Sequence, residues 1–596
     1  MKKNAILAAL ALLSFTACEV EILETATPQA PKMILSASAE QRADTRTSLN
    51  SEKAVVWDAD DALKVFSAEN PGLNGTFSLV DGEGTASASF QGEAIDAESF
   101  LAVYPASSVN GTPTCSEGVW SIPVSIPATQ TFVEGNIPDE ANLAVALGGE
   151  SLAFKNVFGV LKLQLWAKSS CTVKKIQIAA AEPLAGEGTV TYDGSAEPTF
   201  AFTGNTSKVL TIEISAGLKL STDKENPTEV YAVVPAGSFA GGFTVGGATA
   251  SIVISPVRTT KDNTIHRNLV RTMPANTTGI SLVKYLSDLA NTYIVNPSSA
   301  ITVYPYKPDG NLAGHVKTSG FSRTKTISAV SGSSCAGSLS TAAYFKYTAS
   351  ANEGVEVISA SDEDGIFWSW TVWTTDTPAD LTLTDGTVIM DRNLGASAAS
   401  ISDIVSSYAE TRGLNYQWGR KDPVTTGSAR VESSETVGTV EYSIAHPGEF
   451  IYANADGLNA YDWCWEAHND LWSTTKTIYD PCPAGYQVPN GGNTGIFAAN
   501  DFKSNAGTYD STNLGFNVSA LEDGGTFWLP NSAYIKDTGT ALTAYTGGKY
   551  LCCNSVAMTG GGYYGRIMSV AKSGITNSTN QARAIAGSIR CQKISE

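Results

Sequence analysis

The chain has few charged residues and no long apolar segment, and each shortage narrows the classes of protein it can belong to. Charged side chains make up 16% of its 596 residues, and acidic residues outnumber basic ones 58 to 39. A surface with a net charge of −19 repels nucleic acid and anionic membranes, so neither is expected as a partner. No run reaches about 18 apolar residues, so we expect no transmembrane helix.

Sequence signatures of catalysis and metal binding are also missing. There is no G-x-S-x-G, H-E-x-x-H or P-loop motif, and Gly547-Gly548-Lys549 lacks the remaining residues of a phosphate loop. With only four His and no paired CxxC, a zinc site is not expected. The acidic groups at Asp58, Asp60 and Asp61 and at 362–364 lack EF-hand spacing, and we interpret them as solvated turns. We therefore expect no enzyme, no cofactor and no metal site.

The N-terminus reads as an export signal. Lys2 and Lys3 precede an apolar run from Ala5 to Leu13, and Phe15-Thr16-Ala17-Cys18 follows. This order resembles a bacterial lipobox, which implies that Cys18 is lipidated and anchors the protein to the outer membrane at the cell surface. We expect a signal peptide at 1–17 and a lipidated tether at 18–32. The alternative is an ordinary signal peptide that happens to contain a cysteine.

Short alternating apolar segments fill the first half of the chain. Clusters of Asn, Gly, Asp and Pro separate them at intervals of about 8 to 15 residues, and no long stretch has a helical period. This pattern predicts a mainly β fold with two tandem β-sandwiches, at residues 33–150 and 151–275. Apolar segments on both sides of a Ser/Thr/Gly-rich tract predict a small β bridging module at 276–367.

Five segments of this scaffold together resemble a known family. They are Thr45-Arg46-Thr47-Ser48-Leu49, Val56-Trp57-Asp58-Ala59-Asp60-Asp61, Tyr104-Pro105-Ala106, Pro127-Ala128-Thr129-Gln130-Thr131-Phe132 and Phe154-Lys155-Asn156-Val157-Phe158-Gly159-Val160-Leu161. In this order they resemble the fimbrillin family, the pilus subunits of Bacteroidales, over about residues 33–275. The resemblance implies transthyretin-like sandwiches, a lipoprotein precursor and assembly with other fimbrial subunits by strand exchange after proteolysis.

The proteolytic step has specific candidates in this chain. Met33-Ile34-Leu35-Ser36-Ala37 is the expected first strand, and Arg42 and Arg46 follow it in a polar stretch. By resemblance, a trypsin-like protease would cut after one of these arginines, remove the first strand and expose a groove for a strand from a neighbour. The alternative is that both arginines are solvated loop residues and the chain stays anchored by its lipid.

Eight of the eleven tryptophans lie between Trp368 and Trp528, which marks a different C-terminal head. Its motifs are Trp368-Ser369-Trp370-Thr371-Val372-Trp373, Met390-Asp391-Arg392-Asn393-Leu394-Gly395-Ala396, Tyr416-Gln417-Trp418-Gly419-Arg420-Lys421-Asp422-Pro423, Tyr479-Asp480-Pro481-Cys482-Pro483-Ala484-Gly485-Tyr486-Gln487-Val488-Pro489, Phe527-Trp528-Leu529-Pro530 and Gly587-Ser588-Ile589-Arg590-Cys591. They resemble the Fibrobacter-succinogenes-type major paralogous domain over residues 368–596. The resemblance implies an α+β, C-type-lectin-like fold.

Five cysteines lie in the head, and five is an odd number, so at least one thiol is free or pairs elsewhere. The resemblance implies a disulfide between Cys482 and Cys591. It assigns no partner to Cys464, Cys552 or Cys553.

Aromatic residues in the loops of the head are the candidates for ligand contact, because flat rings stack on sugars. The candidate ligand-binding residues are Trp463, Trp465, Trp472, Tyr563 and Tyr564. The alternative for each is packing in the core, which we favour for Trp370, Trp418 and Trp528. A lectin-type calcium site is not expected, because Leu529-Pro530-Asn531 lacks the acidic residue before the proline.

The leading hypothesis is a non-catalytic fimbrial subunit, a tip or minor adhesin whose head binds a glycan or a host surface protein. A shaft subunit needs a free C-terminal donor strand, whereas here the head occupies that end. The alternative is a monomeric outer-membrane lipoprotein that binds glycans and never enters a fibre.

Overall fold

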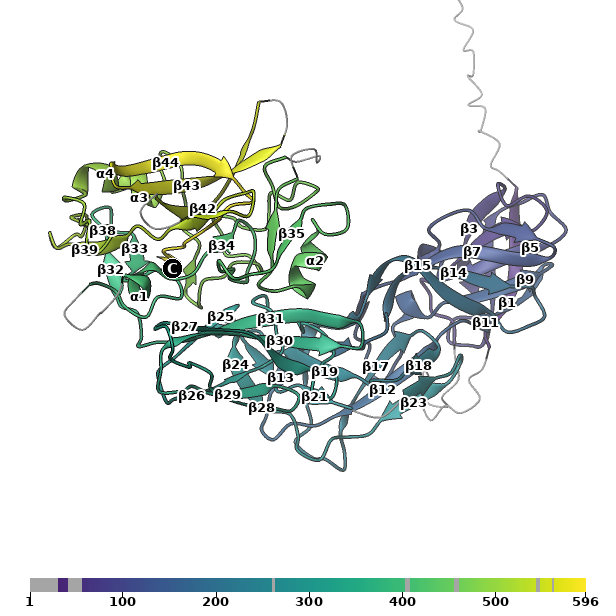
Figure 1. Cartoon of the computed structure of the whole chain (residues 1–596). Coiled ribbons are helices and arrows are strands. Elements are labelled where there is room, and N and C mark those ends of the chain that lie inside the picture. The colour runs from purple at the N-terminus through teal and green to yellow at the C-terminus, as the bar shows by residue number, and fades with distance from the viewer. Residues whose placement is uncertain are drawn as a thin grey trace, which may run out of the picture.

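The computed structural model describes residues 31–40, 56–259, 263–401, 408–454, 460–542, 547–559 and 562–595. Over these residues the protein is mainly β, as the sequence predicts. Figure 1 shows the first sandwich at one end of the molecule and the head at the other, with the second sandwich and the bridging module between them.

An eight-stranded sheet forms the first sandwich. Its strand order is β10 (Ser151–Ala153), β1 (Lys32–Ser38), β4 (Ser87–Glu93), β3 (Asn74–Asp81), β2 (Ala62–Ser67), β5 (Phe100–Tyr104), β9 (Ala144–Gly148) and β11 (Lys155–Asn156). Only Phe154 separates β10 from β11, so the two edges of the sheet meet and the sheet curls around its own apolar core. Trp57, Phe77 and Phe90 lie in this core.

Strands cross between the two sandwiches in both directions. One sheet has the order β15 (Thr199–Ser207), β14 (Ala185–Tyr192), β7 (Val119–Ile126) and β6 (Thr114–Ser116), so β7 pairs with β14. β8 (Thr129–Thr131) also pairs with β16 (Val209–Lys219). β10 and β11 belong to the first sheet although they follow residue 150. The boundary predicted between residues 150 and 151 is therefore wrong, since β pairing, which local sequence does not encode, joins segments far apart in the chain. One core cluster extends from Phe66 to Ile280.

The second sandwich has one large and one small sheet. The large sheet has the order β24 (Leu282–Tyr285), β20 (Ile252–Ile254), β19 (Thr244–Ala248), β13 (Thr172–Ala179), β16 and β8, with β21 (Val257–Arg258) beside β19. The small sheet has the order β17 (Thr228–Val234), β12 (Gly159–Leu165) and β23 (Val270–Met273). A separate pair is formed by β18 (Gly237–Phe239) and β22 (Asn263–Ile265). Single 3₁₀ turns are η1 (Ala106–Ser108), η2 (Asp139–Ala141) and η3 (Leu286–Asp288).

The bridging module consists of two small sheets. One has the order β25 (Thr292–Val295), β31 (Gly365–Thr374), β30 (Gly354–Asp362) and β27 (Phe321–Ser328), and the other β26 (Ala300–Val303), β29 (Phe345–Thr348) and β28 (Ser338–Thr341). The predicted boundary at 367/368 falls inside β31 and is wrong. The Trp368-to-Trp373 motif lies on β31 between β25 and β30, so its tryptophans fill the core of the bridging module and its contact with the head.

The head contains short strands and short helices. Two sheets have four strands each, in the orders β32 (Asp380–Thr382), β33 (Val388–Met390), β46 (Gln592–Lys593), β37 (Tyr486–Gln487) and β34 (Tyr416–Gln417), β45 (Ala586–Gly587), β40 (Tyr534–Ile535), β41 (Ala541–Leu542). A three-stranded sheet has the order β42 (Gly548–Ala557), β43 (Tyr563–Ala571), β44 (Gly574–Ala582). Two strand pairs are β35 (Arg430–Glu432) with β36 (Phe450–Tyr452) and β38 (Gly515–Val518) with β39 (Phe527–Pro530). The helices are α1 (Ala409–Arg412), α2 (Val440–Ala445), α3 (Ile496–Ala499) and α4 (Phe502–Asn505). In the described part of the chain, no helix is long and apolar enough to cross a membrane.

Candidate functional sites: the first strand and the head

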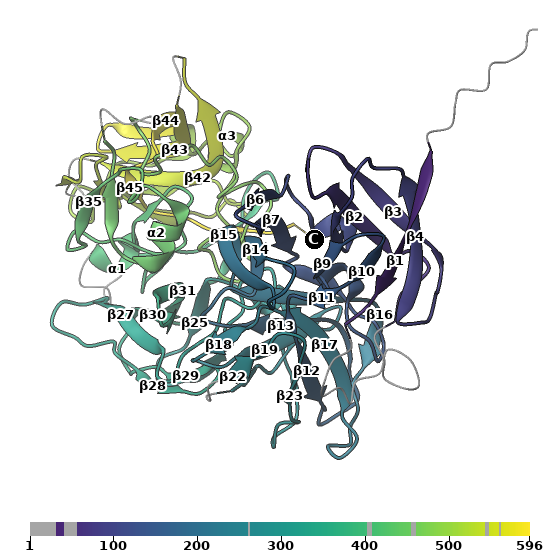
Figure 2. The ribbon, with the colours of Figure 1, turned by 90° about the vertical axis from the view of Figure 1, so that its right-hand side faces the viewer.

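β1 is hydrogen-bonded along both of its edges. It pairs antiparallel with β4, where Leu35 faces Phe90 and Ala37 faces Ala88, and parallel with β10, where Ala37 faces Leu152. Figure 2 shows β1 beside β4 and β10. The strand predicted from Met33 to Ala37 is confirmed, with one additional residue at each end. Removing β1 would leave unpaired backbone groups on both β4 and β10.

The side chains of β1 alternate strictly between the core and solvent. Leu35 and Ala37 are 0% and 3% exposed and belong to the core of the first sandwich, and Met33 packs at its edge. Ile34 points outward and is 53% exposed. The strand therefore fills an apolar slot with every second side chain, which is the geometry of strand complementation.

A cluster of charges holds the end of β1. The Glu40 carboxylate accepts hydrogen bonds from Arg267 Nη1 at 2.6 Å, from Arg267 Nη2 at 3.1 Å and from the backbone N–H of Asn156 at 2.8 Å. Lys155 Nζ lies 3.6 Å from Glu40 Oε1. Arg267 also donates to the Asn156 carbonyl at 2.7 Å and to Glu197 at 2.9 Å. This Glu40 clasp, formed by Glu40, Arg267, Lys155 and Asn156, ties β1 to the junction of the two sandwiches.

Three of the predicted site residues cannot be placed. Cys18, Arg42 and Arg46 lie outside the residues that the structure describes. The described chain stops at Glu40 and resumes at Val56, and both ends of this gap line one small cavity together with Asp58 and Asp139. Lipidation and cleavage therefore remain predictions.

The acidic groups dismissed as solvated turns include two buried residues. Asp61 is 8% exposed and accepts hydrogen bonds from the Tyr104 hydroxyl and the Asp58 N–H, both at 2.8 Å. Asp362 is 3% exposed and pairs with Lys208 at 2.8 Å. Both carboxylates are part of folded turns, because buried carboxylates need hydrogen-bond partners. Among the described residues, no group of three or more His, Cys, Asp or Glu lies together as a metal site would require.

Burial and neighbouring carboxylates also change a pKa in this region. Desolvation, followed by the charges of Asp58 and Asp61, raises the pKa of Asp139 to about 7. Its proton is therefore gained or lost near neutral pH, beside the cavity that Glu40 lines.

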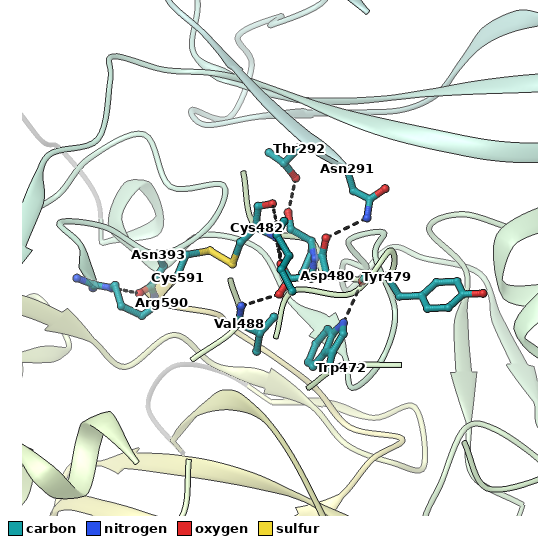
Figure 3. The surroundings of a disulfide bond; sticks show 12 residues. Asn291, Thr292, Asn393, Trp472, Tyr479, Asp480, Cys482, Val488, Arg590 and Cys591 are labelled. Carbon is teal, nitrogen blue, oxygen red and sulfur yellow. Dashed lines mark hydrogen bonds and ion pairs between the residues drawn. A yellow bond between two sulfur atoms is a disulfide. The ribbon is translucent and has the colours of Figure 1, made fainter. Parts of the chain in front are cut away.

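In the head, Cys482 and Cys591 are joined by a disulfide, the pairing that the resemblance implied. Figure 3 shows how the surrounding motif is held. The Asp480 carboxylate accepts the N–H groups of Cys482 and Val488, each at 2.8 Å. Asn291 donates to the carbonyls of Ile478 and Asp480 at 2.7 and 2.9 Å, and Thr292 donates to the Pro481 carbonyl at 2.6 Å. The segment that leads to Cys482, residues 478–481, is thus docked on the start of β25 in the bridging module. We call this segment the disulfide loop.

The other head cysteines are buried free thiols. Burial raises the pKa of both the Cys464 and the Cys553 thiol to about 12, and raises that of Cys552 well above its usual value. All three thiols are therefore protonated at neutral pH, which makes them poor nucleophiles.

Two of the five predicted ligand-contacting aromatics are core residues. Trp463 and Trp472 are each 1% exposed, and their indole N–H groups donate to the carbonyls of Trp418 at 2.7 Å and Tyr479 at 3.0 Å. Their assignment to a ligand face is wrong, because both side chains turn inward from an exposed loop and both indole N–H groups are satisfied within the protein. Trp465, Tyr563 and Tyr564 are half-buried.

The two neighbouring tyrosines point to opposite faces of β43, as consecutive strand residues must. Tyr563 packs against the Arg583 guanidinium, 5.1 Å from the ring centre. Tyr564 meets Tyr461, which is 42% exposed, with ring centres 5.3 Å apart. The structure therefore brings together a tyrosine pair, Tyr461 and Tyr564, rather than the predicted cluster of tryptophans.

The buried Arg583 side chain connects the segments around the tyrosine pair. Its guanidinium carbon lies 3.9 Å from the centre of the Trp418 ring, and Nη1 donates to Asp462 at 3.1 Å. Nη2 donates to Asn469 at 2.6 Å and also to the Ser555 hydroxyl. These contacts fix the loop around Asn469 to the sheet that carries Tyr563 and Tyr564.

Sequence reasoning missed Tyr461, Arg583, Glu40 and Arg267. Tyr461 precedes the predicted Trp463 in an aromatic loop, so extending that candidate loop would have included it. Arg583 belongs to none of the sequence motifs of the head. Glu40 and Arg267 are separated by 227 residues, and no local signal connects them.

Comparison with known proteins gives weak similarities. No family model matches the chain, and no curated protein matches it. Among solved structures, a candidate cell adhesion protein from Bacteroides ovatus is 12% identical with a TM-score of 0.26, covering 43% of this chain and 96% of that one. A fimbrial assembly protein from Parabacteroides distasonis is 12% identical (TM-score 0.18, 42% and 94% covered). The tip fimbrial protein Mfa3 from Porphyromonas gingivalis is 13% identical (TM-score 0.18, 43% and 98% covered).

Proposed function

We propose that the protein is a non-catalytic, cell-surface fimbrial subunit that receives a strand from another subunit in the slot of β1. The observation that carries this proposal is β1 itself. It is a single short strand with both edges paired and alternate side chains in the core, and Arg42 and Arg46 follow it in the sequence. Cleavage at either arginine would free β1 from the rest of the chain, and an equivalent strand would restore the lost contacts.

The position of β46 supports a terminal place in the fibre. β46 is paired with β33 on one side and β37 on the other, and the preceding residue, Cys591, is in the disulfide. A strand held in this way is not available for donation to a neighbour. The protein would accept a strand but give none from this segment, as a tip or minor adhesin does.

The head is the proposed ligand-binding part. The exposed Tyr461 and the half-buried Tyr564 and Trp465 offer flat aromatic surfaces of the kind that stack on sugar rings. A host surface protein is the other ligand class. Before cleavage, Cys18 would anchor the precursor to the outer membrane through its lipid.

The N-terminal residue of the surface-assembled protein tests the assembly step. Cleavage predicts a start at Ala43 or Thr47, and replacing both arginines by glutamine should keep the protein out of isolated fimbriae. A mature chain that begins at Cys18, together with uniform membrane labelling by an antibody to the head, would support the monomeric glycan-binding lipoprotein instead.

A glycan array probed with the full chain tests the ligand step. Replacing Tyr461 and Tyr564 by alanine should abolish a binding signal. The matched control is Tyr285→Ala, which removes a tyrosine that is 57% exposed on the scaffold. Equal loss in the control would show that the signal does not come from the head.

A further inference from the structure

Glu40 belongs to the segment that the proposed cleavage removes, whereas its partners do not. Arg267, Lys155 and the N–H of Asn156 all stay with the body of the protein. The Arg267 side chain is 11% exposed and that of Glu40 is 16% exposed, so the pair is largely shielded from water. The remaining carboxylate at Arg267 is Glu197, whose side chain is 74% exposed.

We propose that these groups form a carboxylate-binding site that selects the incoming strand. This inference rests on the proposed strand exchange. The strand that replaces β1 carries an acidic residue three positions after its last core side chain, as Glu40 follows Ala37. It therefore repeats a pattern of apolar side chains at the positions of Met33, Leu35 and Ala37, followed by a carboxylate at the position of Glu40.

The physical reason is the cost of leaving Arg267 without an acceptor. Without Glu40, the shielded Arg267 guanidinium loses a bidentate carboxylate partner and its charge-assisted hydrogen bonds. An exposed side chain does not replace these bonds fully. An incoming carboxylate would regain both bonds from Arg267 and the bond from the Asn156 N–H. An uncharged residue at that position would regain neither the charge pairing nor the paired geometry.

The site also fixes register. Asp58 and Asp139 line the same cavity as Glu40, so negative charge in general is disfavoured there. A carboxylate placed at Arg267 and Lys155, in contrast, meets two positive charges. A strand shifted by one residue would also turn its apolar side chains away from the core. The apolar slot and the Glu40 clasp therefore favour the same register of the incoming strand, each for an independent reason.

The test uses the full chain with a specific protease sequence placed between Glu40 and Val56, cut at that site. Labelled peptides spanning residues 31–41 are exchanged into the slot, and their dissociation constants are measured by fluorescence anisotropy. The natural sequence should bind, and the Glu40→Gln peptide should bind about tenfold more weakly or worse. In an Arg267→Gln chain, the difference between these two peptides should shrink to about twofold or less.

Controls separate this inference from the proposed function. The Leu35→Asp peptide should not bind, because it places a charge in the core. An Arg271→Gln chain, altered at an exposed arginine of β23, should keep the full preference for the Glu40 peptide. If Arg267→Gln impairs folding in thermal unfolding, Lys155→Gln at the edge of the clasp should still reduce the preference.

The outcomes are distinct. If no peptide binds, the proposed strand exchange fails and the inference fails with it. If the natural peptide binds and the Leu35→Asp peptide does not, but Glu40→Gln binds as well as the natural one, strand exchange stands and the carboxylate site is overturned. An equal loss with Glu40→Gln in the natural and Arg267→Gln chains would also overturn it, because the effect would not involve the clasp.

Discussion

Aromatic side chains of the head and of β31 pack against cationic side chains. On β31, the Trp368 ring centre lies 5.0 Å from the ammonium group of Lys307 and 4.6 Å from that of Lys421. Trp418 carries the Arg583 guanidinium on its face. Cation–π contacts of this kind gain strength when both groups are removed from water. The tryptophan-rich motifs therefore serve the packing of the head and of β31. The candidates that remain for ligand contact are Tyr461, Tyr564 and Trp465.

Replacing Arg583 by methionine should destabilise the head strongly. The Arg583 side chain is fully buried and that of its partner Asp462 is 2% exposed, so the change leaves a carboxylate without its counter-charge. Breaking such a pair costs about 3 to 5 kcal/mol. Five of the eleven tryptophans lie in the head, and Trp418 contacts Arg583 directly, so unfolding followed by tryptophan fluorescence includes a signal from this region.

Two comparisons check that explanation of Arg583. Adding Asp462→Asn to the Arg583→Met variant should recover part of the loss, and Arg566→Met on the same sheet should have a small effect. A similar loss from Arg566→Met would mean that any arginine in or directly after the strands of this sheet matters, and the pairing explanation would be wrong.

Asp139 should make the first sandwich less stable as the pH rises. Its pKa is raised to about 7 by desolvation first, and then by the charges of Asp58 and Asp61. An acid in an unfolded chain has a pKa of about 4, so the folded state holds its proton more tightly. This contribution to stability is full below pH 4 and is lost as the pH rises through about 7. Asp139→Asn should remove that loss, measured by denaturant unfolding at pH 5 and pH 8, whereas Asp223→Asn at an exposed loop should not.

Among the secondary-structure elements, β46 depends most on a covalent bond. The Cys482–Cys591 disulfide closes a loop with a sequence separation of 109 residues. In the chain-entropy model, such a cross-link stabilises by about 4 to 5 kcal/mol. Replacing both cysteines by serine should lower the unfolding midpoint of the head and increase hydrogen exchange in β46 and β37. Cys115→Ser, at an exposed free cysteine, provides the control and should leave both unchanged.

The secondary structure is predictable from the sequence, whereas the pairing of distant strands is not. Alternation of polar and apolar residues predicts the mainly β fold and the strand at Met33 to Ala37, because alternation is a local property. The pairing of β7 with β14 and of β31 with β25 is not local, and both predicted domain boundaries at these places are wrong. The polar loop around Trp463 and Trp472 predicts a ligand face, but both side chains leave the exposed loop and pack in the core, which polar neighbours in the sequence do not reveal.

The same distinction applies to the candidate sites. The Cys482–Cys591 pairing was implied by two motifs of one resemblance, and the structure contains it. The Glu40–Arg267 contact depends on the chain returning to β1 after two sandwiches, and no spacing in the sequence encodes it. Cleavage at Arg42 or Arg46 and lipidation at Cys18 stay predictions.

At the scale of the whole molecule, the scaffold and the head are joined by packed contacts. Tyr306 of the bridging module reaches into the second sandwich, where its hydroxyl donates to the Ile254 carbonyl at 2.8 Å and accepts the Gly247 N–H at 3.1 Å. A Cβ atom on Gly246 would lie 2.5 Å from that hydroxyl, so glycine is required for this approach. On the other side, Asn291 and Thr292 hold the disulfide loop of the head. In the proposed role at the end of a fibre, these contacts would carry force between the head and the scaffold.

Removing the contacts of Asn291 and Thr292 should therefore uncouple the head from the scaffold. In an Asn291→Ala, Thr292→Val variant, the buried carbonyls of Ile478, Asp480 and Pro481 lose their donors, at about 1 to 3 kcal/mol for each unsatisfied group. We expect calorimetry to show a head transition at lower temperature than in the natural protein, and small-angle scattering to show a broader range of molecular dimensions. Ser340→Ala, on the exposed face of β28, should change neither measurement. An unchanged scattering profile in the double variant would mean that these hydrogen bonds do not hold the head in place, which would leave that role to the tryptophan packing around β31.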